Sequence, residues 1–243
     1  MDNAKAKILV LVEGAKTDVK LLKHLLSVYG IDQSHQIISY NTNIYSLYNL
    51  MFRNTNPDDV DILQLLKEHE TVAERKAVFN ERYSDIFDLD PQDPQFSSTK
   101  ITEMMNYFVE SSDMGKLYLN YPMVESFYHM KSIPDDDYWS YTATMQELSN
   151  HIYKSRVAAE NRNHDYSKFA VDKSECNIVI KQNIEKAWKI VKDDISFQYE
   201  RILPDPADVL DIQLKKLKED NALFVLCTCV FYIPDYNSKL IAE

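Results

Sequence analysis

The sequence predicts an α/β fold with a mostly parallel sheet flanked by helices, followed by a helical C-terminal region. Short apolar runs alternate with helical patterns over residues 1–130, and this order favours parallel strands joined by helices. The chain of 243 residues has only 3 glycines and 8 prolines, which disfavours a turn-rich all-β fold. We therefore expect an α/β domain over residues 1–132 and a mainly helical part over residues 133–243.

The first strand and helix are the clearest elements of the N-terminal half. Lys7–Val12 is an apolar run without alternation, as expected for a strand buried on both faces. Apolar residues then recur at helical spacing from Val19 to Val28, and Gly30 follows as a stop signal. The other predicted elements of this half are strands at Gln36–Tyr40, Tyr83–Asp90 and Lys116–Pro122, and helices at Ile44–Met51, Asp59–Asn80 and Lys100–Ser111.

Helical patterns dominate after Ile133, where no further strand is predicted. Asp205 and Pro206 mark one helix start, because an acid caps the first turn and proline suits the first helical position. The apolar stretch Ala222–Ile233 is too short to span a bilayer, so we expect it to form a core helix. The predicted helices are Tyr138–Arg156, Cys176–Tyr199, Pro206–Glu219 and Ala222–Ile233.

Composition and charge narrow the class of protein. A hydrophobic content of 45% and an aromatic content of 12% are typical of a folded globular chain. The net charge of −11 disfavours a general nucleic-acid coat protein, which is expected to be basic. The three cysteines, Cys176, Cys227 and Cys229, form neither a disulfide framework nor a zinc spacing. We expect reduced thiols in a cytoplasmic protein without a membrane segment.

Acidic residues follow the ends of three predicted strands. Glu13 comes directly after the first strand, Asp88 and Asp90 end the third, and Glu125 follows the fourth. Because ligands bind at the carboxyl ends of parallel strands, we expect these carboxylates to meet at one edge of the sheet. The spacing of Asp88 and Asp90 places both on one side of an extended strand.

Carboxylates at close range cannot all stay ionised without a cation, and Mg²⁺ or Mn²⁺ prefers such oxygen ligands. The pattern therefore predicts a metal site suited to phosphodiester cleavage. Each part also has a structural interpretation. Glu13 with Gly14 is compatible with a plain strand-to-helix turn, the Asp-Pro loop after Asp88 with a solvated surface, and Glu125 with a helix N-terminus that favours acids. The conjunction of the three groups is more specific than any one of them.

The same residues resemble the signature motifs of the Toprim domain. "LVLVEGAKTD" places an acid after the first strand, and "DIFDLDPQD" supplies an Asp-x-Asp after a later one. Together with "YPMVES", the arrangement is most similar to RloB-like proteins and to OLD-associated Toprim nuclease effectors of bacterial phage defence. The resemblance covers roughly residues 5–130. Pro91 and Pro94 stand where the family often has a glycine-containing turn.

The resemblance implies a role for each matching acid. Glu13 corresponds to the family glutamate, which serves as general acid or base or as a metal ligand. Asp88 and Asp90 correspond to the metal-binding pair, and Glu125 resembles an additional catalytic acid of the RloB-like group. Asp93 has no secure counterpart. Lys16 follows Glu13 at a helix N-terminus, where backbone N–H groups and an ammonium suit a phosphate.

Basic residues outnumber acidic ones between Lys154 and Lys192. Aromatic residues are interleaved with them, which is typical of single-stranded nucleic-acid or tRNA binding. The alternative is that the lysines form the outer face of an amphipathic helix. His164 beside Asp165 is either an acid/base group or a surface loop residue. The residues expected to contact nucleic acid are Lys16, Lys154, Arg156 and Arg162.

These observations predict a Mg²⁺- or Mn²⁺-dependent nuclease that hydrolyses DNA or RNA, including tRNA as a candidate. The resemblance implies an effector of antiviral defence that a partner ATPase controls. The alternative is an inactive Toprim-like subunit that docks on a partner protein, with its acidity matched to a basic partner surface. Association of copies of the chain, through an edge strand or through Ala222–Ile233, stays open.

Overall fold

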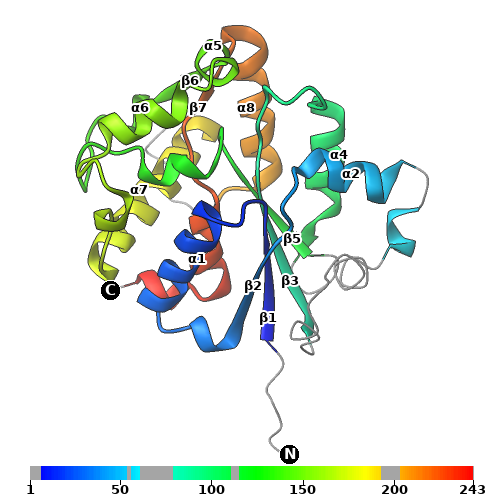
Figure 1. Cartoon of the computed structure of the whole chain (residues 1–243), viewed down its shortest axis with the longest axis horizontal. Helices are drawn as coiled ribbons and strands as arrows, with labels where there is room; N and C mark the ends of the chain where they lie inside the picture. The colour runs from blue at the N-terminus through cyan, green and yellow to red at the C-terminus, as the bar shows by residue number, and fades with distance from the viewer. Residues whose placement is uncertain (1–6, 54–55, 61–78, 111–114, 193–202, 243) are drawn as a thin grey trace, which may run out of the picture. The chain divides into compact units, whose positions relative to one another are not determined.

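Five strands form one sheet in the order β2-β1-β3-β5-β4 in this computed structural model (Figure 1). The structure describes residues 7–53, 56–60, 79–110, 115–192 and 203–242. β1 (Lys7–Val12) pairs in parallel with β2 (His35–Ser39) and with β3 (Phe79–Asp88). At the far edge β4 (Val109–Glu110) runs antiparallel to β5 (Gly115–Asn120). The predicted α/β class with a mostly parallel sheet is confirmed.

Contacts within the chain divide it into two compact units. The first comprises Met1–Ile86 and Tyr107–Leu117, and the second comprises Phe87–Asn106 and Tyr118–Glu243. The division therefore passes through β3 and β5, so that the last residues of both strands belong to the second unit. The predicted division between residues 132 and 133 stays a prediction.

The first unit is organised around β1. Its residues Leu9 to Val12 are fully buried, which agrees with the apolar run that predicted this strand. α1 (Thr17–Val28) buries leucines that recur every three or four residues, because these positions share one face of a helix. α2 (Ile44–Phe52) starts at Asn43, whose side chain accepts a hydrogen bond from the Ser46 amide.

The second unit is mainly helical, as predicted for the C-terminal region. α8 begins as expected, because the Asp205 side chain caps it by accepting a hydrogen bond from the Ala207 amide. Two short strands, β6 (Thr142–Thr144) and β7 (Ala222–Phe224), pair with each other in a separate antiparallel sheet. The helices of this unit are α4 (Ser98–Tyr107), α5 (Met145–Ser149), α6 (Tyr153–Glu160), α7 (Lys173–Lys192), α8 (Pro206–Asp220) and α9 (Tyr232–Tyr236).

The predicted helix Tyr138–Arg156 is wrong over its first half. Residues Tyr138–Ser140 form a 3-10 turn and Thr142–Thr144 form β6, and the α-helices start only at Met145 and Tyr153. Thr144 forms a capping box with Glu147, in which each side chain accepts a hydrogen bond from the backbone amide of the other residue. The Thr-x-x-Glu spacing is the sequence signal that marks this later helix start.

The predicted helix Ala222–Ile233 is also wrong. Ala222–Phe224 forms β7 against β6, and the chain then runs irregularly to a 3-10 turn at Cys229–Phe231 before the short α9. The Gln213 side chain satisfies both backbone groups of Phe224. Its Nε2 donates to the Phe224 carbonyl, and its Oε1 accepts from the Phe224 backbone N–H. A short apolar run is compatible with a strand or a helix, and here the contacts with partners distant in the sequence determine which of the two forms. Nearly all of its apolar side chains are buried in this unit, whereas Phe224 is partly exposed, and association through this stretch stays a prediction.

Other predicted bounds shift by a few residues or fall outside the described residues. The predicted helix Lys100–Ser111 ends at Tyr107 and is followed by β4, and β3 starts earlier and ends earlier than predicted. Most of the predicted helix Asp59–Asn80 lies outside the described residues, and its last two residues belong to β3. The end of the predicted helix Cys176–Tyr199 also lies outside them.

Asp85 is a fully buried carboxylate in β3, opposite Leu11 of β1. Neither carboxylate oxygen has a hydrogen-bond partner among the described residues. Burial therefore raises the pKa of Asp85 well above its ordinary value, because nothing offsets the loss of hydration of the charged form. The folded chain accommodates this residue as a neutral acid.

Replacing Asp85 with Asn should stabilise the protein at neutral and alkaline pH. Below pH ~4 Asp85 is protonated in both the folded and the unfolded chain, so wild type has its full stability there. As pH rises toward the raised pKa of the folded state, Asp85 ionises only in the unfolded chain, and stability is lost. Asp85→Asn removes this loss, so its advantage in the free energy of unfolding should grow with pH to about 1–3 kcal/mol. Urea denaturation between pH 4 and pH 8 measures it.

The exposed Asp59→Asn is the matched control and should show no such growing difference. Parallel stability curves for wild type and Asp85→Asn would contradict the assignment of a neutral, buried acid.

Candidate metal centre

Glu13 stands where β1 has ended and the turn to α1 begins. Its backbone continues the sheet pairing on both sides, because its amide donates to the Ile86 carbonyl at 3.1 Å and its carbonyl accepts from the Asn41 amide at 2.9 Å. The position of its Cα is thus fixed by two neighbouring strand ends. This backbone pairing explains why a strand terminus can present a carboxylate in a defined place.

Gly14 leaves room for the buried side chain of Asp18, which lies in the first turn of α1. A Cβ atom at position 14 would clash with Asp18 Oδ2. A larger residue at position 14 would therefore displace the Asp18 carboxylate, which lies near the positive end of the helix dipole, where an acid is favourable. The tight turn carries the chain from the site-bearing strand end directly into α1.

Asp88 and Asp90 reach the site by different local structures. Asp88 is the last residue of β3 and is buried, whereas Asp90 lies beyond the strand with a left-handed φ of 42°. Asp is one of the few non-glycine residues that tolerate this conformation. The two side chains come together as their spacing by two predicts, although Asp90 itself lies beyond the end of the strand. The Asp90 amide donates to the Pro122 carbonyl at 3.2 Å, which fixes the turn.

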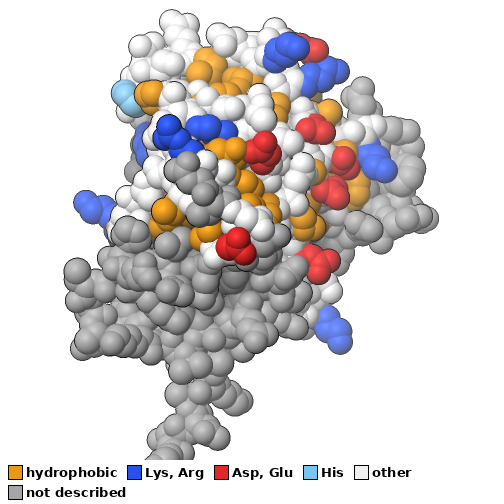
Figure 2. Space-filling model, turned by 90° about the vertical axis from the view of Figure 1, so that its right-hand side faces the viewer, with side chains coloured by type: hydrophobic (Ala, Val, Ile, Leu, Met, Phe, Trp, Pro, Cys, Tyr) orange, Lys and Arg blue, Asp and Glu red, His pale blue; other side chains and the backbone are white. Residues whose placement is uncertain are grey.

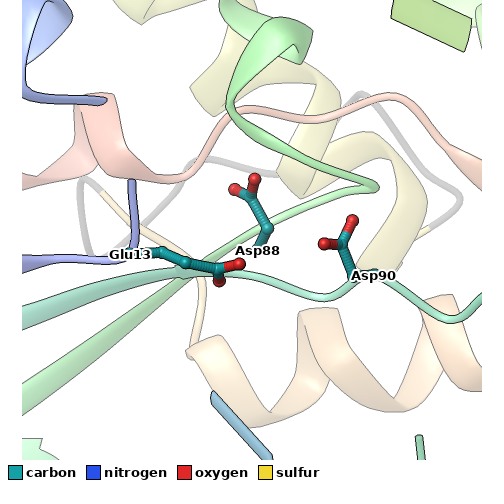
Figure 3. Close-up of side chains that lie close together, drawn as sticks. All are labelled: Glu13, Asp88 and Asp90. Atoms are coloured by element: carbon teal, nitrogen blue, oxygen red, sulfur yellow. The ribbon is translucent and has the colours of Figure 1, made fainter. Parts of the chain in front are cut away.

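The side chains of Glu13, Asp88 and Asp90 converge (Figure 3). Each offers one carboxylate oxygen, and these three oxygens lie within 4.8 Å of one another. Burial raises the pKa of Asp90, and the charges of Glu125 and Asp93 raise it further, against the hydrogen bond from Gln92 and the charge of Lys154. A divalent cation among these oxygens would favour their ionised forms.

Three carboxylates and no soft ligand suit Mg²⁺ or Mn²⁺, which prefer oxygen. Asp88 is buried and the other two acids are partly exposed, so the cluster is reachable from solvent. These residues fit the divalent ion that the sequence predicts.

Glu125 lies beside this cluster but is not one of the three converging acids. It follows β5 on a 3-10 turn (Val124–Tyr128) and is buried. Its Oε1 forms an ion pair of 3.1 Å with Lys154, and its Oε2 has no hydrogen-bond partner among the described residues. The negative charge of Glu125 is one of the causes that raise the pKa of Asp90.

Lys154 brings a positive charge to the acids. Its side chain is 62% exposed, so the ammonium stays accessible to solvent. Desolvation lowers its pKa, but the pair with Glu125 and the charges of Asp88 and Asp90 outweigh that effect and raise it. The sequence singled out Lys154 only as one of many basic residues, whereas the structure places it next to Glu125, Asp88 and Asp90.

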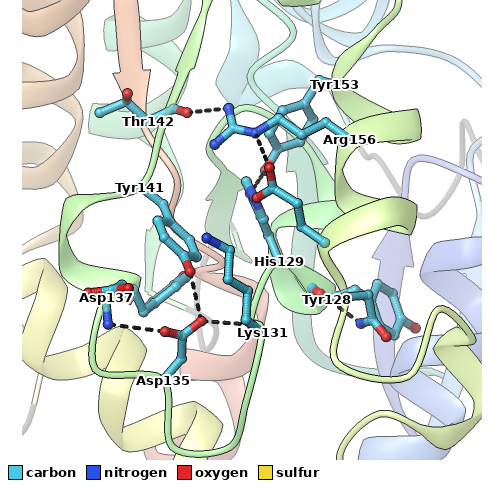
Figure 4. Close-up of polar contacts among 12 residues, drawn as sticks. Tyr128, His129, Lys131, Asp135, Asp137, Tyr141, Thr142, Tyr153 and Arg156 are labelled. Atoms are coloured by element: carbon cyan, nitrogen blue, oxygen red, sulfur yellow. Dashed lines mark hydrogen bonds and ion pairs between the residues drawn. The ribbon is translucent and has the colours of Figure 1, made fainter.

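A buried polar network fixes α6, the helix that carries Lys154 (Figure 4). His129 bonds the Tyr153 hydroxyl at 3.2 Å and Glu160 at 3.1 Å, one partner on each ring nitrogen. Burial lowers the pKa of His129 to about 4, although Glu160 opposes this shift, so the ring is neutral at physiological pH. Because Tyr153 and Glu160 lie at the two ends of α6, the network sets the orientation of the helix.

The other residues predicted to contact nucleic acid have different surroundings. Lys16 is exposed at the N-terminus of α1. Arg156 is held by Glu147, by Glu160 and by the Thr142 carbonyl, and Arg162 pairs with Glu175 at 2.8 Å. These internal bonds give the two arginines a structural role, and their contact with nucleic acid stays a prediction.

The predicted outer face of lysines on α7 has one exception. Lys186 is buried and donates to the carbonyls of Tyr138 and Tyr141, and its burial lowers its pKa well below the ordinary value. Lys189 instead lies over the exposed ring of Trp139, with its Nζ 3.7 Å from the ring centroid. His164 lies in a loop and bonds the Ala158 carbonyl, so it takes no part in the acid cluster.

No family model, no curated protein and no solved structure matches this chain. Within the described residues, no helix has both the length and the apolar character needed to cross a bilayer. The resemblance to the Toprim domain thus rests on the short motifs that carry Glu13, Asp88 and Glu125.

Replacing Gly14 with Ala should destabilise the turn between β1 and α1. The new Cβ would overlap Asp18 Oδ2, and overpacking of this kind costs about 1–3 kcal/mol. The free energy of unfolding from urea titration measures the loss. In an Asp18→Ala background the clashing carboxylate is gone, so Gly14→Ala should cost much less. Equal costs in both backgrounds would rule out this packing explanation.

Proposed function

We propose that this protein is a nuclease that depends on Mg²⁺ or Mn²⁺ and hydrolyses phosphodiester bonds of DNA or RNA. The observation that carries the proposal is the convergence of Glu13, Asp88 and Asp90, whose ligand oxygens lie within 4.8 Å at the ends of β1 and β3. A site built from carboxylates, beside an accessible lysine, suits a phosphate-containing substrate that a divalent cation brings to the protein.

The acids of the site have different proposed roles, which follow from their positions. Asp88, the buried acid at the end of β3, would hold the cation together with Asp90, which lies two residues further along the chain. Glu13 is a metal ligand and is also placed to exchange a proton with the reacting water or leaving oxygen. A bound divalent ion supplies charge neutralisation and Lewis-acid activation of the phosphodiester. Glu125 acts indirectly in this proposal, by holding Lys154.

Lys154 binds the phosphate of the substrate. Its side chain stays 62% exposed while the ammonium pairs with Glu125, whereas the side chains of Arg156 and Arg162 are only 26% and 24% exposed. The local cation matters because the chain carries a net charge of −11. On the face that Figure 2 shows, the described acidic and basic side chains are interspersed, and several of opposite charge lie next to one another. Substrate binding therefore depends on the ion and on single basic groups more than on a broad basic surface.

The biological setting is proposed from the resemblance of the motifs. A cytoplasmic nuclease of this kind acts as an effector of antiviral defence, and a partner ATPase restrains it until infection. An inactive docking subunit is the competing function, which the experiments below separate from a nuclease.

Replacing Glu13 with Gln should abolish metal-dependent cleavage. The change removes a ligand charge and the proton-transfer group while keeping the side-chain volume, so the cleavage rate should fall by roughly 100-fold or more. Plasmid DNA, single-stranded DNA, RNA and tRNA are incubated with the purified full chain and Mn²⁺, with and without EDTA, and cleavage is followed on gels.

Asp88→Asn and Asp90→Asn should behave like Glu13→Gln, and the exposed Asp136→Asn is the control that should retain activity. Cleavage that Glu13→Gln leaves unchanged would refute the proposed site. Absence of cleavage by wild type, together with Mn²⁺ binding too weak to measure, would favour the docking subunit.

Replacing Lys154 with Gln should weaken nucleic-acid binding and reduce its salt dependence. Loss of one phosphate contact lowers the slope of log affinity against log salt by about one. Fluorescence anisotropy with labelled single-stranded DNA or RNA at several salt concentrations measures both, in a Glu13→Gln background that prevents cleavage.

Arg162→Gln is the matched control, because the Arg162 guanidinium pairs with Glu175 at 2.8 Å. It should lower stability while leaving the salt slope unchanged. A slope that changes for Arg162→Gln and not for Lys154→Gln would reverse the assignment of the phosphate contact.

A further inference from the structure

A buried amide side chain touches one acid of the proposed metal site. Asn120 is the last residue of β5 and is fully buried. Its Nδ2 donates a hydrogen bond of 3.2 Å to Asp88 Oδ1. On the other side of the amide, Oδ1 accepts from the Cys229 backbone amide at 3.2 Å and lies 3.5 Å from the Cys227 thiol, which donates to it. The side chain thus links Asp88 to a segment more than 100 residues away in the sequence.

These partners allow one orientation of the amide. A flipped Asn120 would place its oxygen against a carboxylate oxygen of Asp88 and its NH₂ group against the N–H of Cys229. Both contacts would be repulsive in a buried place where water cannot compensate. The amide therefore presents a donor to Asp88 Oδ1 and fixes the position of that carboxylate oxygen.

The backbone around Asn120 is held as firmly as its side chain. The amide and carbonyl of Tyr121 each bond Leu226 at 2.8 Å, and the Thr228 hydroxyl donates to the Leu119 carbonyl at 2.6 Å. The Asn120 carbonyl accepts from the Leu89 amide at 3.1 Å, one residue beyond Asp88. The segment Leu226–Cys229 therefore supports the residue that contacts Asp88.

We propose that Asn120 is a positioning residue of the metal site, which fixes the orientation of the Asp88 carboxylate through its hydrogen bond of 3.2 Å to Oδ1. The inference rests on the proposed metal-dependent function. A ligand that is bonded in this way binds its ion more tightly, because the carboxylate needs no reorientation. Asn120 itself does not touch the ion or the substrate.

The inference predicts that Asn120→Ala weakens Mn²⁺ binding roughly 10–100-fold. Isothermal titration calorimetry or Mn²⁺ electron paramagnetic resonance on the full chain measures the affinity, and thermal unfolding without metal measures stability. If Asn120→Ala does not fold, Asn120→Ser takes its place, because its shorter hydroxyl does not reach Asp88.

Asn183 provides a matched control. It is also a fully buried asparagine that holds the same segment, because its Oδ1 accepts from the Cys227 amide at 2.9 Å and from the Tyr138 hydroxyl at 2.7 Å. None of its recorded partners is an acid of the site. Asn183→Ala should therefore lower the unfolding temperature while changing the Mn²⁺ affinity much less than Asn120→Ala.

A double-mutant cycle tests whether Asn120 acts through Asp88. In an Asp88→Asn background, where the carboxylate is absent, Asn120→Ala should change the Mn²⁺ affinity by no more than about threefold. Additive effects of the two substitutions, or a wild-type affinity for Asn120→Ala, would overturn the positioning role while leaving the metal site intact. A wild-type chain that binds no divalent ion would instead overturn the proposed function.

Discussion

The hydrogen bond from the Glu13 amide to the Ile86 carbonyl extends the pairing of β1 and β3 by one residue beyond β1. Parallel register then brings the carboxyl ends of the two strands to the same edge, so that Glu13 and Asp88 come together although they are far apart in the sequence. Both faces of β1 are buried, so a slip by one residue would exchange its side chains between the two faces and disturb their packing. Sheet pairing is therefore the constraint on which the candidate site depends.

Electrostatics oppose this arrangement, and several groups offset the cost. The acids repel one another, and the raised pKa of Asp90 reflects its burial and its acidic neighbours. Lys154 lowers the local negative charge, the Gln92 side chain donates to Asp90, and Asn120 donates to Asp88. Three carboxylates that bring one oxygen each within 4.8 Å of one another remain suited to a divalent cation.

Buried polar side chains organise the second unit as much as its apolar core does. Asn120 and Asn183 complete the backbone of the irregular segment near Cys227, and His129 ties the two ends of α6 together. Each of these groups has partners on both sides of its polar head, so its burial is not penalised. Asp85 in the first unit contrasts with them, because its oxygens lack hydrogen-bond partners among the described residues and the group is accommodated as a neutral acid.

Local patterns in the sequence determined the class of fold, the strand at Lys7–Val12, the helix that ends before Gly30 and the capped helix at Pro206. They also identified the three acids that converge, because strand ends and acidic residues are visible without coordinates. Only the tertiary structure decided that Ala222–Phe224 is a strand, that Asp90 lies in a left-handed turn, and that Lys154 and Asn120 adjoin the acids. The reason is physical: periodicity and capping act between near neighbours, whereas these choices depend on partners that only the folded chain brings within hydrogen-bonding distance.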